Sequence, residues 1–125
     1  MGFDITTSGS FKNLDGFFAR MKRWKIERML ENYGVQGVDA LSNATPEDTG
    51  ETANSWRYRV RVDKVGWAIE WYNTNIVDGR PIAILIQYGH GTGTGGYVQG
   101  RDYINPAIRP IFDRITDELW KEVTK

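Results

Sequence analysis

The 125-residue sequence contains no cysteine and a single histidine. The missing cysteines exclude disulfides, thiolate metal sites and cysteine nucleophiles, and they favour folding in a reducing compartment. His90 stands alone, without the further histidine or cysteine ligands of a metal cluster. We therefore expect no metal site, no cofactor and no cysteine chemistry.

Long hydrophobic runs and net charge are also missing. The longest apolar run, Ile82 to Ile86, is far shorter than the roughly 20 residues that cross a bilayer. Lys plus Arg and Asp plus Glu both number 16, so no long-range field draws the protein to nucleic acid or to an anionic membrane. Residues 1–10 lack the basic and apolar parts of a secretory signal. We expect these ten residues to be flexible, the protein to begin in the cytosol, and no membrane partner.

Aromatic residues, by contrast, are abundant at 13%, and five of them are tryptophans. The length and the hydrophobic fraction of 40% fit one domain, residues 1–125, with one core. A domain of this size is expected to leave some of its aromatic rings outside the core. Amphipathic rings are favoured at interfaces, so the surplus predicts contacts with other subunits.

The first half of the chain changes from a helical period to a strand period. Apolar residues recur at three- and four-residue steps over 11–33, which predicts an amphipathic helix that Gly34 and Gly37 loosen. A second helical stretch over about 38–44 ends at Thr45-Pro46, and Thr49 is expected to cap a short helical turn through Ser55. Strict alternation over 56–62 and 67–73 then predicts an antiparallel hairpin with one basic face.

The second half is predicted to hold a short buried helix over 82–88, a mobile glycine-rich loop over 89–100, and a long final helix. Asn105 is a good N-cap and Pro106 suits the first helical position. The final helix carries an apolar stripe: Ile108, Ile111, Phe112, Ile115, Leu119 and Val123. We expect an α+β fold in which the long N-terminal and C-terminal helices pack on one face of a small antiparallel sheet.

Three patterns suggest enzyme chemistry, and each has a simpler explanation. The run Gly91 to Gly96 satisfies G-x-G-x-x-G, but 97–103 is expected to be extended, whereas a dinucleotide site needs a helix there. His90 has no partner that the sequence fixes as a nucleophile. Glu47, Asp48 and Glu51 are better explained as acidic residues at a helix start than as a catalytic or cation-binding cluster.

Arg57, Arg59 and Arg61 form a basic ladder on one strand face. Such a face binds phosphates or single strands when aromatic rings are interleaved, but here Tyr58 points to the opposite face. The favoured interpretation is a solvated or subunit-pairing face. A nucleic-acid-binding module built on these three arginines is the alternative function.

A set of motifs resembles the phage putative tail-component family, whose members are head-tail joining, neck or tail-completion proteins of long-tailed phages. The turn that follows the first helix carries Pro46, Asp48, Thr49, Gly50 and Ser55. Tyr88-Gly89 precedes the glycine-rich loop, and Tyr103 with Pro106 and Ala107 opens the last helix. The chain departs from the family pattern at Gln87, where glutamate is common, at His90, where threonine is common, and at Thr52, where an apolar residue is common.

The resemblance implies a structural virion-assembly protein with no catalytic residues. It implies self-association into a ring, with a hexamer as the expected form, between connector and tail-tube proteins in the neck of the virion, after assembly in the host cytoplasm. Nucleic acid is expected only as the passing genome. We expect subunit or partner contacts at these residues: Arg57, Arg59, Arg61, Trp67, Trp71, Tyr88, Gly89, His90, Gly91, Gly93, Gly95, Gly96 and Tyr97.

Overall fold

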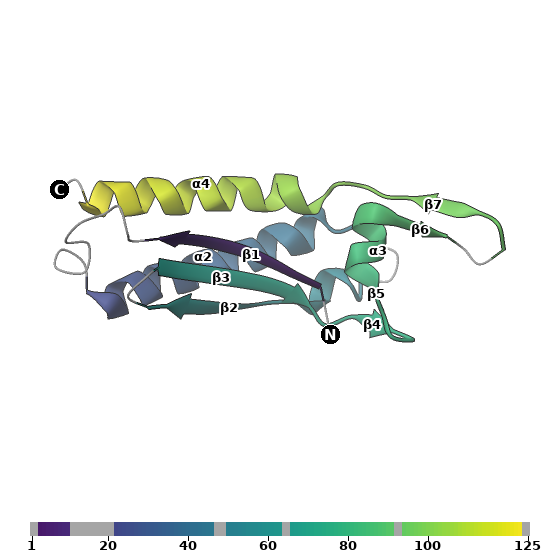
Figure 1. Cartoon of the computed structure of the whole chain (residues 1–125), viewed down its shortest axis with the longest axis horizontal. Coiled ribbons are helices and arrows are strands. Elements are labelled where there is room, and N and C mark those ends of the chain that lie inside the picture. The colour runs from purple at the N-terminus through teal and green to yellow at the C-terminus, as the bar shows by residue number, and fades with distance from the viewer. Residues whose placement is uncertain (1–2, 11–21, 47–49, 64–65, 92–93, 124–125) are drawn as a thin grey trace.

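The computed structural model describes residues 3–10, 22–46, 50–63, 66–91 and 94–123, and these form an α+β fold. The long helices α2 and α4 lie against a small antiparallel sheet, and short hairpins extend from one end (Figure 1). The elements follow one another along the chain as β1 (Phe3–Ser10), α2 (Arg23–Ala44), η1 (Ala53–Ser55), β2 (Trp56–Val62), β3 (Gly66–Asn73), β4 (Ile76–Val77), β5 (Arg80–Pro81), α3 (Ile82–Tyr88), β6 (Gly89–Gly91), β7 (Tyr97–Gln99) and α4 (Ile104–Val123).

The main sheet has three strands in the order β1-β3-β2, and both pairings are antiparallel. The predicted hairpin is confirmed as β2 and β3. Residues 3–10, which we expected to be flexible, instead form β1, whose Ile5 lies opposite Trp71. In this strand the half-buried Ile5 and the buried Thr7 alternate with the exposed Thr6 and Ser8. The sequence itself shows only a short alternation of Phe3 and Ile5 with Asp4 and Thr6.

Helix α2 runs without a break through Gly34 and Gly37, so the prediction that these glycines loosen it is wrong. A Cβ at Gly34 would lie 2.3 Å from the ring of Tyr58, and one at Gly37 would lie 2.3 Å from the ring of Trp71. The indole Nε1 of Trp71 also donates a hydrogen bond to the carbonyl oxygen of Gly34 at 2.9 Å. The glycines therefore let two aromatic rings lie directly on the helix backbone. Residues 11–21, the first part of the predicted helix, lie outside the described residues.

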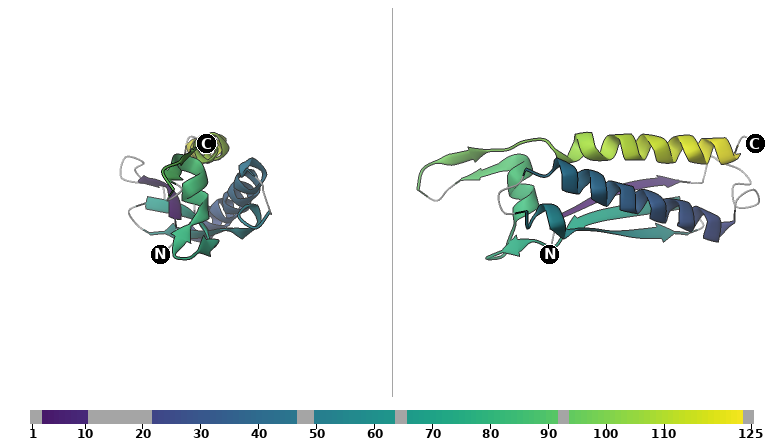
Figure 2. Two further views of the ribbon diagram at one scale, coloured as in Figure 1. Left: turned by 90° about the vertical axis from the view of Figure 1, so that its right-hand side faces the viewer. Right: turned by 180° about the vertical axis from the view of Figure 1, so that it is seen from behind.

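Helix α2 covers one face of the sheet, and α4 closes the core along the side where β1 lies (Figures 1 and 2). The two helices are antiparallel, and the Tyr33 hydroxyl on α2 donates to Glu118 on α4 at 2.6 Å. The predicted apolar stripe of α4 is buried at Ile108, Ile111, Ile115 and Leu119. Phe112 differs, because its side chain remains 37% exposed while its ring lies 6.3 Å from that of Trp67.

The start of α4 is capped differently from the prediction. The helix begins at Ile104, so Asn105 and Pro106 lie inside its first turn rather than at the N-cap and first position. The side-chain oxygen of Gln87, at the end of α3, accepts hydrogen bonds from the backbone N–H groups of Tyr103 and Ile104, both at 3.1 Å. A glutamine distant in sequence therefore satisfies two amides at the start of the helix, which lie before the position of the expected local cap.

Candidate functional site

Exposed apolar side chains gather at one end of the molecule. Within the described part of the chain nine large hydrophobic residues are exposed, and five of these lie on the two short hairpins and the adjoining end of α3. We call this region, residues 76–81 and 88–100, the hairpin end. Its five exposed hydrophobic residues are Ile76, Val77, Tyr88, Tyr97 and Val98. An apolar concentration of this kind is typical of a surface that binds another protein.

The larger hairpin, β6–β7, occupies the segment that we expected to be an irregular loop. Gly89–Gly91 pairs antiparallel with Tyr97–Gln99, and the pair extends beyond the α-β body (Figure 1). Gly89 is required here on two grounds: its φ is +82°, and a Cβ would lie 2.5 Å from the carbonyl oxygen of Val98. Since β7 follows the glycines, no helix opens after them. The dinucleotide-binding interpretation therefore lacks its structural requirement.

Gln87 fixes the base of this hairpin. Its side chain is 6% exposed, and in addition to capping α4 it donates from Nε2 to Oδ1 of Asp102 at 2.8 Å. The hydroxyl of Tyr103 donates to the carbonyl oxygen of Ala83 at 2.9 Å, and burial raises the pKa of Tyr103 above its ordinary value. The hairpin therefore leaves the body from a fixed junction of α3 and α4. Sequence reasoning missed Gln87 because the segment that it caps lies 16 and 17 residues away.

A shallow hollow of about 630 Å³ lies beside this junction. The rings of Tyr88 and Tyr97 form part of its wall, and both side chains are more than half exposed. The hydroxyl of Tyr97 donates to the carbonyl oxygen of Tyr88 at 3.1 Å, which holds the two residues together. The other residues of the wall are Gln87, Gln99, Gly100, Asp102 and Asn105.

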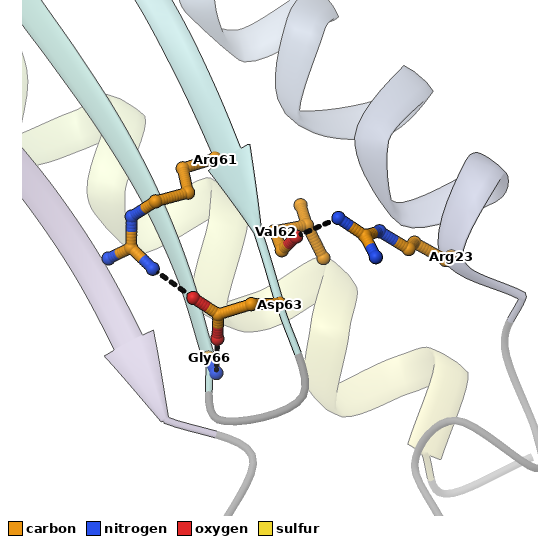
Figure 3. Close-up of polar contacts among 5 residues, drawn as sticks. All are labelled: Arg23, Arg61, Val62, Asp63 and Gly66. Carbon is orange, nitrogen blue, oxygen red and sulfur yellow. Dashed lines mark hydrogen bonds and ion pairs between the residues drawn. The ribbon is translucent and has the colours of Figure 1, made fainter.

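The three arginines of β2 lie on the outer face of the sheet, as predicted, and all three are exposed. Arg59 forms an ion pair with Glu70, directly opposite on β3, and its guanidinium lies 5.0 Å from the centre of the Tyr72 ring. Arg61 pairs with Asp63, whose other carboxylate oxygen accepts from the N–H of Gly66 (Figure 3). The ladder therefore contacts carboxylates and a ring of its own chain.

Arg57, the first rung of the ladder, donates from Nη1 to the backbone carbonyl oxygens of Asn54 and Trp56. At the other end of β2, Arg23 on α2 donates to the carbonyl oxygen of Val62 (Figure 3). Arginine side chains thus contact the backbone at both ends of this strand.

Trp67 and Trp71 do not belong to the accessible surface, contrary to the sequence prediction. They are 3% and 0% exposed, because both side chains point to the face of the sheet that the helices cover. The aromatic rings left outside the core are different ones. Trp24 and Trp120 are exposed on α2 and α4, and Tyr88 and Tyr97 are exposed at the hairpin end.

The predicted structural turn is only partly described, since Asp48 and Thr49 lie outside the described residues. Gly50 is buried with φ +80°, which agrees with its expected backbone role, and its carbonyl oxygen accepts from the N–H of Asn54 at 3.0 Å. The hydroxyl of Ser55 donates to the carbonyl oxygen of Glu51 at 2.6 Å. Pro46 follows Thr45, the C-cap residue of α2.

The hydroxyl of Thr52 accepts a hydrogen bond from the side chain of Asn75 at 2.8 Å. The backbone carbonyl oxygen of Thr52 accepts one from the side chain of Asn73, also at 2.8 Å. A buried polar residue is therefore satisfied at a position where the resembled family commonly has an apolar one.

Of the four acidic and histidine residues considered for enzyme chemistry, the structure describes His90 and Glu51, which lie on different parts of the chain's fold. His90 lies on β6, and its Nδ1 is enclosed without a hydrogen-bond partner among the described residues. Glu47 and Asp48 lie outside the described residues, and Glu51 is exposed. Across the described ranges no three His, Cys, Asp or Glu side chains are grouped to hold a metal ion. The same ranges contain no helix with the length and apolar character needed to cross a membrane.

Comparison with known proteins gives no match to a family model, to a curated protein or to a solved structure. The resemblance to the phage tail-component family therefore remains a prediction that rests on the sequence motifs.

Proposed function

We propose that the protein is a structural virion-assembly component of a tailed phage or prophage. In this proposal it joins head and tail or completes the tail, and it acts as a homo-oligomeric component of the neck. It works by packing against copies of itself and against neighbouring neck, connector or tail-tube proteins. It has no catalytic residue and needs no cofactor.

The observation that carries this proposal is the apolar hairpin end. Five exposed large hydrophobic residues project from a body that already has its own core of buried tryptophans and isoleucines. Among the described residues these five side chains stay exposed after folding, and exposed apolar residues that lie near one another favour contact with another molecule. The motifs around Gly50, Tyr88 and Pro106, which resemble those of phage tail components, indicate which kind of assembly this is.

The alternative, nucleic-acid binding through Arg57, Arg59 and Arg61, is less well supported. Two of the three guanidinium groups form ion pairs within the chain, and the third contacts backbone carbonyl oxygens. A phosphate backbone would have to compete with these contacts. The overall net charge of zero adds no attraction at long range.

Light scattering after size exclusion, over a range of protein and salt concentrations, tests the self-association. We expect an assembly of defined mass, or a mass that rises with protein concentration. A monomer under all conditions contradicts the homo-oligomeric part of the proposal. Binding to a single-stranded oligonucleotide that weakens steeply with salt would favour the alternative, because it reports the release of counterions.

The neck role is tested separately, by deleting the gene from the genome that encodes it. Electron microscopy of the resulting particles should show filled heads and separate tails that have not joined. Normal joined particles would contradict the neck role even if the purified protein forms a ring.

A further inference from the structure

The two edges of the main sheet differ in how they are protected. Edge strands usually carry charged side chains, proline or a cover, because their free backbone groups otherwise recruit other strands. Edge strand β2 carries three arginines, and arginine side chains hydrogen-bond the carbonyl oxygens of Trp56 and Val62. Edge strand β1 carries a single charged residue, Asp4 near its start, and no proline.

The strand register shows which groups of β1 point outward. Backbone hydrogen bonds join Asp63 to Gly66 and Ser55 to Thr74, at the two ends of the β2–β3 pairing. In an antiparallel pair every second residue is hydrogen-bonded in this way, so alternate residues of β3, including Glu70, direct their backbone N–H and C=O groups toward β2. The residues between them, including Ile69 and Trp71, direct theirs toward β1. On β1, Thr7 lies opposite Ile69 and Ile5 lies opposite Trp71, so the backbone groups of Thr7 and Ile5 point toward β3. The backbone N–H and C=O groups of the alternate residues, Thr6 and Ser8, therefore point away from the sheet.

A groove of about 400 Å³ runs between β1 and α4, on the side of β1 away from β3. Its apolar wall is formed by Ile5, Ile108 and the half-exposed Phe112. Its charged residues are one arginine and one aspartate, Arg109 and Asp113, which cancel. A strand placed here would find backbone partners on one side and an apolar helix surface on the other.

We propose that this edge of β1 receives the β6–β7 hairpin of a second copy of the chain, by strand addition. The inference rests on the self-association proposed above and identifies its two complementary surfaces. Residues 88–100 contain no Asp, Glu, Lys or Arg, so the hairpin brings no carboxylate, ammonium or guanidinium group of its own into the groove. Tyr97 and Val98 are both exposed, and because they are consecutive residues of β7, one of them can face Phe112 and the groove while the other faces the opposite side.

The hairpin of the same copy does not fill this groove. It extends from the end of the molecule at which α4 begins and points away from its own β1 (Figure 1). The contact is therefore heterologous: a hairpin at one end of a copy meets an edge strand on the side of the next. Contacts of this type form rings when the rotation closes, whereas β1 pairing with β1 would form an isologous dimer.

Because the chain has no cysteine, single substitutions can report the contact directly. Thr6→Cys and Ser8→Cys place a thiol on β1, and Tyr97→Cys and Val98→Cys place one on the hairpin. All four positions are exposed, so the fold should tolerate the changes. Each β1 variant is mixed with each hairpin variant under mild oxidation. In the control, Asp39→Cys is mixed with each hairpin variant instead, because Asp39 is an exposed residue of α2.

We expect a disulfide-linked pair that contains one β1 variant and one hairpin variant, with little linkage to Asp39→Cys. Efficient linkage of Thr6→Cys to itself would overturn the proposal, because it indicates β1 pairing with β1. Absence of any β1–hairpin linkage in protein that light scattering shows to be oligomeric would overturn the docking site and leave the proposed function intact. A monomeric wild-type protein would overturn the self-association and this contact together.

Discussion

The α-β body and the hairpin end use their aromatic residues in opposite ways. Trp56, Trp67 and Trp71 are at most 3% exposed in the body, whereas Tyr88 and Tyr97 are 62% and 67% exposed at the hairpin end. The body therefore gains its stability from aromatic burial. The hairpin end keeps its aromatic surface available for another molecule. We expect substitutions in the body to change the free energy of unfolding and substitutions at the hairpin end to change association.

The largest expected effect is that of Trp71→Ala. The ring is fully buried against Gly37, and its Nε1 bonds Gly34, so its loss should lower the free energy of unfolding by about 3–5 kcal/mol. Tyr97→Ala is the control at the hairpin end and should change the same quantity by less than about 0.5 kcal/mol. Urea denaturation followed by circular dichroism measures both. Equal losses in the two variants would contradict the division between body and hairpin end.

Gln87→Ala tests the junction between the two regions. It removes the acceptor for the N–H groups of Tyr103 and Ile104, and leaving buried donors unpaired should cost about 2 kcal/mol. Hydrogen exchange should become faster at these two amides. Gln99→Ala, on the exposed surface of β7, is the matched control and should leave the exchange at both amides unchanged.

Gly37→Ala tests how closely α2 approaches the sheet. The added methyl group would lie 2.3 Å from the Trp71 ring, and overpacking of this kind costs about 1–3 kcal/mol. The higher helix propensity of alanine returns about 1 kcal/mol, so we expect a net loss of about 1 kcal/mol. Gly91→Ala is the control, since its nearest contact would be at 3.9 Å. A gain in stability at position 37 would show that the helix can move away from the sheet.

The smallest effect concerns alkaline pH. Burial, and then the hydrogen bond to Glu118, raise the pKa of Tyr33 from its ordinary 10.0 to about 12. The folded state therefore favours the neutral phenol. The stability that Tyr33 gains from this shift is complete below pH 10. Between pH 10 and 12 the unfolded chain releases the phenol proton before the folded protein does, so this stability is lost as the pH rises.

Tyr33→Phe should reduce this alkaline loss of stability. Denaturation midpoints of the wild type and the variant, compared from about pH 9 to about pH 11, measure the difference. The pKa of Tyr58 is also raised, by burial and then by its hydrogen bond to Glu31. This shift lowers stability at alkaline pH in the same way, so the variant should still lose some stability as the pH rises. Identical slopes in the two proteins would show that Tyr33 does not contribute.

The sequence was sufficient for elements with a strong local period. The alternation over 56–62 predicted β2 with its exposed arginines, and the stripe that contains Ile111 and Ile115 predicted α4. The turn residues before Ile82 and the glycine after Tyr88 bounded α3 correctly. Each of these predictions depended on neighbours a few residues away, where periodicity carries the information.

The features that were missed depend on contacts between residues distant in sequence. Gly34 and Gly37 look like helix breakers until Tyr58 and Trp71 are placed against them. Strand β1 has few apolar residues and forms by pairing with β3, whose residues lie 56 to 70 positions further along the chain. At the candidate site, the excess of aromatic residues correctly predicted exposed rings. It did not identify which ones, because Trp67 and Trp71 lie on the face of β3 that the helices cover, and that assignment depends on where the helices pack.

The pairing of β1 with β3 also sets an order of events during synthesis. Residues 3–10 find their partner only in residues 66–73, so β1 must wait until β3 has left the ribosome. Helix α2 and the β2–β3 hairpin use local contacts and can form earlier, whereas closing the β1–β3 loop carries the larger entropic cost. We expect the first strand of the nascent chain to be the last of the three to join the sheet.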